Sequence, residues 1–166
     1  MDKLFFGCLL VFLDIPLNFG STVIELLPDF AGYLLICKGC AQRVHPAQHR
    51  LWVLSAVAAA YSGLVYASDL LGIFRGLWQL LIQGGALLLS LLVSHQVLRC
   101  IQQTLQIPAG KLQNLRMAWQ AQGVVLGIGW CLSWLPVIRD IAGLAGLLVS
   151  ACFLVALYKV KECGKI

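Results

Sequence analysis

Charged side chains are scarce in this sequence. Asp, Glu, Lys and Arg together make up 11% of its 166 residues, and hydrophobic residues make up 60%. Soluble domains carry about 25% charged residues, so the composition excludes an ordinary soluble domain. Seven acidic residues stand against twelve basic ones, a net charge of +5. A nucleic-acid-binding role is not expected, because it would need a soluble basic face.

Catalytic motifs are also lacking. The sequence has no evident nucleophile paired with a general base, no glycine-rich phosphate loop and no dense cluster of metal ligands. We therefore expect no enzymatic activity, no cofactor and no resident metal. A membrane thiol or metal enzyme is the least favoured alternative.

Apolar segments fill most of the chain. Each is close to the 20 or so residues that a membrane-spanning helix needs, and together they leave no room for a separate soluble domain. Their approximate ranges are 4–20, 22–40, 51–73, 77–98, 116–137 and 141–158. The pattern predicts an all-α, polytopic transmembrane bundle of six helices, arranged as three hairpins in one integral membrane domain over residues 1–166.

Basic residues between the segments predict the orientation of the chain. Ten of the twelve fall at the two termini and in the loops around 38–50 and 99–116, which leaves Arg75 and Arg139 on the other side. Because Lys and Arg concentrate in cytoplasmic loops, both termini are expected in the cytoplasm. The net positive charge then favours contact with the anionic inner leaflet of the lipid bilayer.

Small residues recur every four positions on three of the segments. This spacing lets helix backbones approach closely in lipid, so it predicts packing within the bundle, with a homodimer face as the alternative. The three sets are Ser55, Ala59, Gly63 and Ala67; Gly123 and Gly127; and Ala142, Gly146 and Ser150.

Carboxylates and prolines interrupt the first two segments. Asp14 and Pro16 lie within "LLVFLDIPL", and Pro28 and Asp29 follow in "ELLPDF". If the chain turns near Ser21, the two interruptions face each other near mid-depth. Proline breaks or kinks a helix, and non-helical backbone at that depth must be satisfied by protein or water. The first hairpin is therefore expected to be broken or re-entrant.

A carboxylate at mid-depth is a candidate for function, since it costs about 2.5–3.5 kcal/mol on insertion scales. We expect Asp14 and Asp29 to lie close together in a polar pocket that takes a cation or a small cationic solute. The candidate ion- or substrate-binding residues are Asp14, Asn18, Glu25, Asp29, Gln79 and Gln83.

A simpler interpretation of "LPDF" is the start of a helix. Proline suits the first helical position and an acid suits the first turn. In that case Glu25 lies in an outer loop, and the helix from Pro28 to about Arg43 is too short to cross the membrane unaided. The two glutamines then form ordinary hydrogen bonds between helices.

Cysteine and histidine residues follow the second segment. Cys37, Cys40, His45 and His49 supply the ligand types of a zinc site, but the gap between the pairs is far shorter than the roughly 12 residues of a zinc finger. A redox pair is disfavoured because disulfides are rare in the cytoplasm. We expect both cysteines to be reduced and free of metal.

The first third of the chain carries a resemblance. "LFFGCLLVFLDIPLNFGSTVIELLPDFAGYLLICKG", and most specifically "LLPDFAGYLLI" at 26–36, resembles the start of a group of small uncharacterised bacterial membrane proteins with an LPDFxGYxLI segment. The resemblance covers less than half of the chain. It implies a protein of the bacterial inner (plasma) membrane with six helices, or with a hairpin and four helices, and it implies no activity.

Two functional hypotheses follow. The first is a transporter, channel or substrate-binding membrane subunit that uses the acidic pocket, because broken helices near the midplane form transporter sites. The alternative is a non-catalytic accessory or interaction protein, whose helices pack in a homo-oligomer or against a membrane partner protein.

Overall fold

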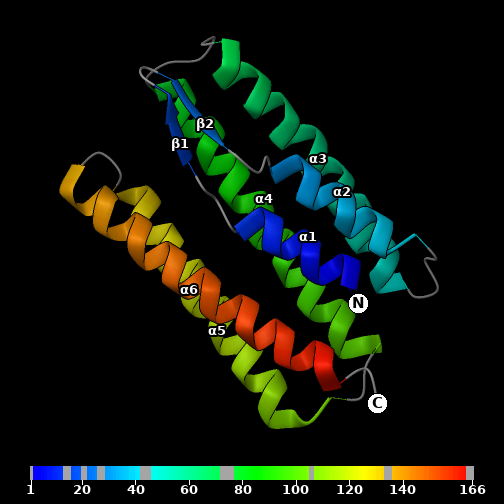
Figure 1. Ribbon diagram of the computed structural model, residues 1–166. Coiled ribbons are helices and arrows are strands. Elements are labelled where there is room, and N and C mark those ends of the chain that lie inside the picture. Colours follow the sequence, from blue (N-terminus) through cyan, green and yellow to red (C-terminus); the bar gives the residue numbers. More distant parts are fainter. Residues whose placement is uncertain are drawn as a thin grey trace. The chain divides into compact units, whose positions relative to one another are not determined.

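The computed structural model describes residues 2–12, 16–19, 22–25, 29–41, 46–71, 77–104, 107–132 and 136–163 (Figure 1). Within these ranges the chain forms six helices and one pair of short strands. The elements are α1 (Asp2–Phe12), β1 (Pro16–Phe19), β2 (Thr22–Glu25), α2 (Asp29–Gly39), α3 (Pro46–Leu71), α4 (Leu77–Thr104), α5 (Ala109–Cys131) and α6 (Pro136–Cys163). The predicted all-α class is confirmed, with two four-residue strands added where the first hairpin is interrupted.

Three of the helices are long and apolar enough to cross a bilayer. The stretches are Pro46–Ser68 of α3, Trp78–Thr104 of α4 and Ile141–Lys161 of α6, with 23, 27 and 21 residues. At 1.5 Å per residue each exceeds the roughly 30 Å of a hydrocarbon core. The chain is therefore a membrane protein.

The described residues thus contain three such spans, where six apolar segments were predicted. α1 and α2 have 11 residues each, about 16 Å, so neither crosses a bilayer alone. α1 ends at Phe12, inside the predicted segment 4–20, and α2 begins at Asp29, inside the predicted segment 22–40. α5 has 23 residues, but its first eight carry Lys, Gln, Asn and Arg, which lower its apolar character.

The chain divides into two compact units, residues 1–96 and 97–166. The first contains α1, the strand pair, α2, α3 and most of α4. The second contains the end of α4 with α5 and α6. Each unit has its own packing, and the expectation of one membrane domain stays a prediction.

The two strands of the first unit form an antiparallel hairpin. Pro16 pairs with Glu25 and Phe19 pairs with Thr22, so the chain reverses its direction between these two strands. The predicted turn near Ser21 lies outside the described residues. β-Branched residues favour strands.

The helices α1 and α2 continue this hairpin and touch along their backbones. A Cβ atom on Gly7 would lie 2.8 Å from the carbonyl oxygen of Gly32, and one on Gly32 would lie 2.7 Å from that of Gly7. Such distances are too short for any side chain at either position. Two glycines thus allow the close approach that stabilises helix pairs in lipid.

The helix α3 packs against α2 and buries small residues in its first half. Ser55 and Ala59 are buried, whereas Ala67 is exposed, so the predicted stripe is confirmed along the first half of the helix. Farther along, the rings of Phe30 and Tyr66 meet edge to face with their centroids 6.1 Å apart. These contacts join α2 to a spanning helix.

A tyrosine of α3 forms a hydrogen bond to α4. The Tyr61 hydroxyl donates a hydrogen bond to the carbonyl oxygen of Ile82 over 3.0 Å. Gly85 makes the approach possible, because a Cβ atom there would collide with the same hydroxyl.

In the second unit, α5 and α6 pack antiparallel through small and polar residues. A Cβ atom on Gly146 would lie 3.1 Å from Cδ2 of Leu126. One turn along α6, the buried Gln122 amide donates a hydrogen bond to the Ser150 hydroxyl over 3.3 Å. The predicted packing role of the small residues on α6 is confirmed.

One of the two glycines predicted for α5, Gly127, is not at this interface. A Cβ atom on Gly127 would meet nothing within 4 Å, whereas one on Gly129 would lie 2.9 Å from the Cβ of Ala142. The prediction that Gly127 packs against a neighbouring helix is therefore wrong for the α5–α6 interface. Helix rotation sets which face meets the partner, and spacing alone does not determine it.

Adding a methyl group at the α1–α2 crossing should destabilise the first unit. We expect Gly7→Ala and Gly32→Ala each to lower the free energy of unfolding by about 1–3 kcal/mol, as overpacking does. Thermal unfolding in detergent, followed by far-ultraviolet circular dichroism, measures the effect. Gly143→Ala is the control, since its Cβ would meet nothing within 4 Å and alanine favours helix. Wild-type stability of Gly7→Ala would contradict the packing.

Candidate functional site

The acidic positions of the first hairpin lie where helix and strand meet. α1 ends at Phe12 and β1 begins at Pro16, with Asp14 between them. Asp14 is outside the described residues, so its distance from Asp29 stays a prediction. The bounds of the helices show only that Asp14 follows the end of α1 in the sequence and that Asp29 is the first residue of α2.

Asn18 and Glu25 both belong to the strand pair. Asn18 pairs with Val23, and Glu25 pairs with Pro16, so the two candidates are two residues apart along the ladder. The simpler interpretation put Glu25 in an outer loop, and on this point it is wrong because Glu25 ends β2.

Asp29 lies in the first turn of α2, as the simpler interpretation expected. Its side chain is half-buried, and a carboxylate at a helix N-terminus is stabilised by the helix dipole by about 0.3–1 kcal/mol. Tyr33 follows one turn later and is buried. Burial, then the charge of Asp29 and then Cys8 raise the pKa of the Tyr33 phenol, so this hydroxyl keeps its proton beside the carboxylate.

The basic residues of the hairpin lie at its opposite end. Lys3 is near the start of α1 and Lys38 is in the last turn of α2. These ends lie side by side, since a Cβ atom on Gly39 would be 3.2 Å from Cγ of Leu4 and 3.4 Å from Cβ of Lys3. About 14 Å of helix therefore separates the lysines from the strand end, where the acidic positions are.

Gln79 and Gln83 lie one turn apart near the start of α4. Gln79 is half-buried and Gln83 is exposed. They are on a spanning helix of the same unit as the hairpin, and their part in a shared pocket stays a prediction.

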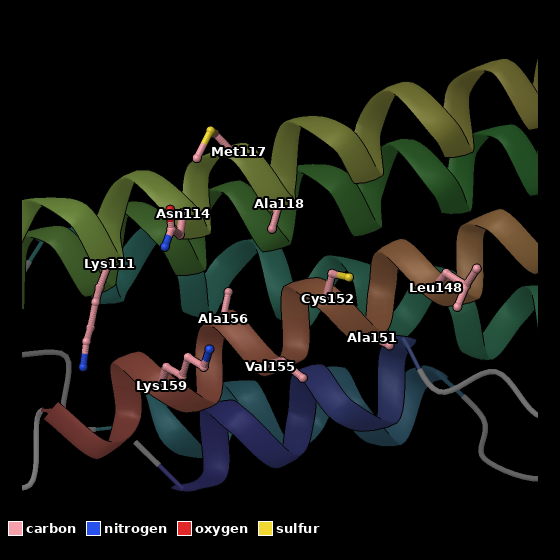
Figure 2. A pocket seen from close by; sticks show the side chains of 10 residues that line it. All are labelled: Lys111, Asn114, Met117, Ala118, Leu148, Ala151, Cys152, Val155, Ala156 and Lys159. Atoms are coloured by element: carbon pink, nitrogen blue, oxygen red, sulfur yellow. The ribbon is translucent and has the colours of Figure 1, made fainter.

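A second candidate site was missed by the sequence analysis. A groove of about 540 Å³ runs between α5 and α6 (Figure 2). Lys111 and Lys159 were a usable signal, because they lie near the start of one predicted helix and the end of an antiparallel neighbour, but both were interpreted as markers of orientation. The lining residues are Lys111, Asn114, Met117, Ala118, Leu148, Ala151, Cys152, Val155, Ala156 and Lys159.

The cysteines Cys37 and Cys40 are free thiols and are buried. The Cys37 thiol donates a hydrogen bond to the carbonyl oxygen of Trp52 over 3.5 Å. Burial raises the pKa of this thiol. Within the described ranges no three His, Cys, Asp or Glu residues are grouped as metal ligands; His45 lies outside them.

Comparison with known protein families, with curated proteins and with solved structures finds no match for this chain. The resemblance of its first third to bacterial membrane proteins therefore stays a prediction.

The buried thiols should react slowly with alkylating reagents. We expect Cys8, Cys37 and Cys40 to be modified by N-ethylmaleimide after the exposed Cys131, because the reagent must reach a thiolate and burial disfavours that form. Peptide mass spectrometry of the folded protein in detergent measures the order. Unfolded protein is the control, in which all four should react alike. Stoichiometric zinc that is lost in Cys37→Ser/Cys40→Ser would contradict a structural role for these thiols.

Proposed function

We propose that this protein binds a cation or a small cationic solute at the break in its first hairpin, as a transporter, a channel or a substrate-binding membrane subunit. The observation that carries the proposal is the pair of 11-residue helices, α1 and α2, joined by a strand pair with acidic positions at the helix ends.

Each of these helices has about half the length needed to cross a hydrocarbon core. Helix ends within a bilayer are tolerated where protein or a water-filled cavity satisfies the backbone groups. The two strands pair with each other, so part of the backbone between α1 and α2 has hydrogen-bond partners within the protein. Discontinuous helices of this kind form the ion and substrate sites of many transporters.

Helix polarity favours a cation at the end of α1. The last four carbonyl groups of a helix have no partner within it, and they give its C-terminus a partial negative charge. α1 ends at Phe12, and Asp14 follows two residues later. A carboxylate next to a carbonyl-rich helix end is a suitable environment for a monovalent cation or a proton.

The neighbouring charges support the same assignment. Lys3 and Lys38 are at the far ends of the two helices, so the basic ends of the hairpin and its acidic positions are at opposite ends of α1 and α2. An acidic helix end attracts a cation more strongly than a basic one.

One observation favours a second candidate, an accessory protein that packs against a partner helix. Gly127 and Gly143 have open space where a side chain would be, and small residues on a lipid-facing surface are typical of helix docking. Under this candidate the carboxylates are structural.

Removing the carboxylates should abolish cation binding. We expect Asp14→Asn and Asp29→Asn to eliminate cation-dependent flux in proteoliposomes, because the amide keeps the shape and loses the charge. Asp2→Asn is the matched control, since Asp2 starts α1 and is far from the break. Altered thermal stability with unchanged flux, for both variants, would favour the accessory candidate instead.

The proposed topology is a re-entrant first hairpin followed by four spans, with both termini in the cytoplasm. α3, α4 and α6 qualify as spans by length and composition. We take α5 as the fourth span, since its 23 residues are long enough and it runs antiparallel to α6 along the interface described above. An even number of spans puts the two termini on one side, in agreement with the ten-to-two division of basic residues.

A cysteine near the C-terminus tests this orientation. In a variant that keeps Cys163 as its one cysteine, a membrane-impermeant maleimide applied to intact cells should fail to label the protein. The control carries Arg75→Cys instead, in the predicted outer loop, and should be labelled. Labelling of Cys163 in intact cells would reverse the orientation.

A further inference from the structure

We propose that the groove between α5 and α6 holds one anionic phospholipid. Its phosphate lies between Lys111 and Lys159, and one acyl chain follows the apolar floor of the groove. The proposal is independent of the cation site, which belongs to the other unit of the chain.

The two lysines are brought together by the antiparallel packing of the helices. Lys111 is the third residue of α5 and Lys159 is the fifth from the end of α6. Both are at the same end of the groove (Figure 2). Asn114 lies one turn from Lys111, where its amide is able to donate to a phosphate oxygen. Charge-assisted hydrogen bonds to phosphate are among the strong ones in proteins.

The remainder of the groove is apolar. Met117, Leu148 and Val155 are each about half exposed or more, at 50%, 70% and 55%, and they flank a floor of alanines and Cys152. From Leu148 to Lys159 α6 rises about 16 Å, which is about half of the roughly 30 Å hydrocarbon core. The groove therefore matches one leaflet in length.

Charge complementarity selects an anionic occupant. The ten lining residues include two lysines and no acid. Basic pockets between transmembrane helices on the cytoplasmic side are typical sites for anionic headgroups, and the proposed orientation puts the lysine end on that side. A free phosphate would leave the apolar part of the groove unused.

A second copy of the chain fits the groove less well. A two-fold axis along the membrane normal presents the same patch from both subunits, so Lys111 and Lys159 of each copy would meet their counterparts at the same depth. Four lysine side chains would then be brought to one place in the interface, where like charges repel. A phospholipid brings the opposite charge to the same place.

The test is lipid selectivity. The purified protein is incubated in detergent with equal amounts of phosphatidylglycerol and phosphatidylcholine of matched acyl chains, and bound lipid is counted by native mass spectrometry. We expect one retained phosphatidylglycerol, preferred by on the order of thirtyfold, from two lysines near a headgroup. The preference should vanish in Lys111→Gln/Lys159→Gln. It should persist in Lys38→Gln/Lys161→Gln, which loses the same charge outside the groove.

A second variant tests the acyl chain. Ala118→Phe fills the floor and should reduce retention of both lipids, whereas Ala60→Phe, on the exposed surface of α3, should not; thermal unfolding verifies that each variant is folded. Millimolar inorganic phosphate should not displace the lipid. Equal retention of both lipids by the wild type, displacement by phosphate, or a dimer that Ala118→Phe converts to monomer would each overturn the proposal.

Discussion

The backbone contact between Gly7 and Gly32 is the constraint on which the first unit depends. It holds two helices of 11 residues together, although isolated helices of this length are marginal. α2 also packs against α3, where Ser55 and Ala59 are buried and the rings of Phe30 and Tyr66 are in contact. Any larger residue at the crossing would move the acidic positions that follow.

Much of this arrangement was predictable from the sequence. The interruption of the first two segments followed from Asp14, Pro16 and Pro28, and the facing of the two interruptions followed from an assumed turn near Ser21. The strands were missed because the apolar stretch was interpreted by its length, and the Gly20-Ser21 connection between β-branched and aromatic residues was not used as a hairpin signal. A short apolar run does not distinguish strand from helix by composition alone.

Helix rotation accounts for most of what the sequence did not predict. On α6 the small residues Gly146 and Ser150 do face α5, but the matching positions on α5 are Leu126 and Gln122, with Gly127 left open. Spacing shows that a helix has a small face. It does not show which of several faces meets a given neighbour, since that depends on the partner's side chains as well.

The groove between α5 and α6 is a consequence of the same packing. The helices are in close contact at Gly129, Gly146 and the Gln122–Ser150 pair, and the groove is lined by the small residues Ala118, Ala151 and Cys152. In water such a hollow would be a liability, but in a bilayer an acyl chain is the surrounding solvent. The two lysines at its end then decide which lipid supplies that chain, because the apolar floor accepts any acyl chain and the charges discriminate among headgroups.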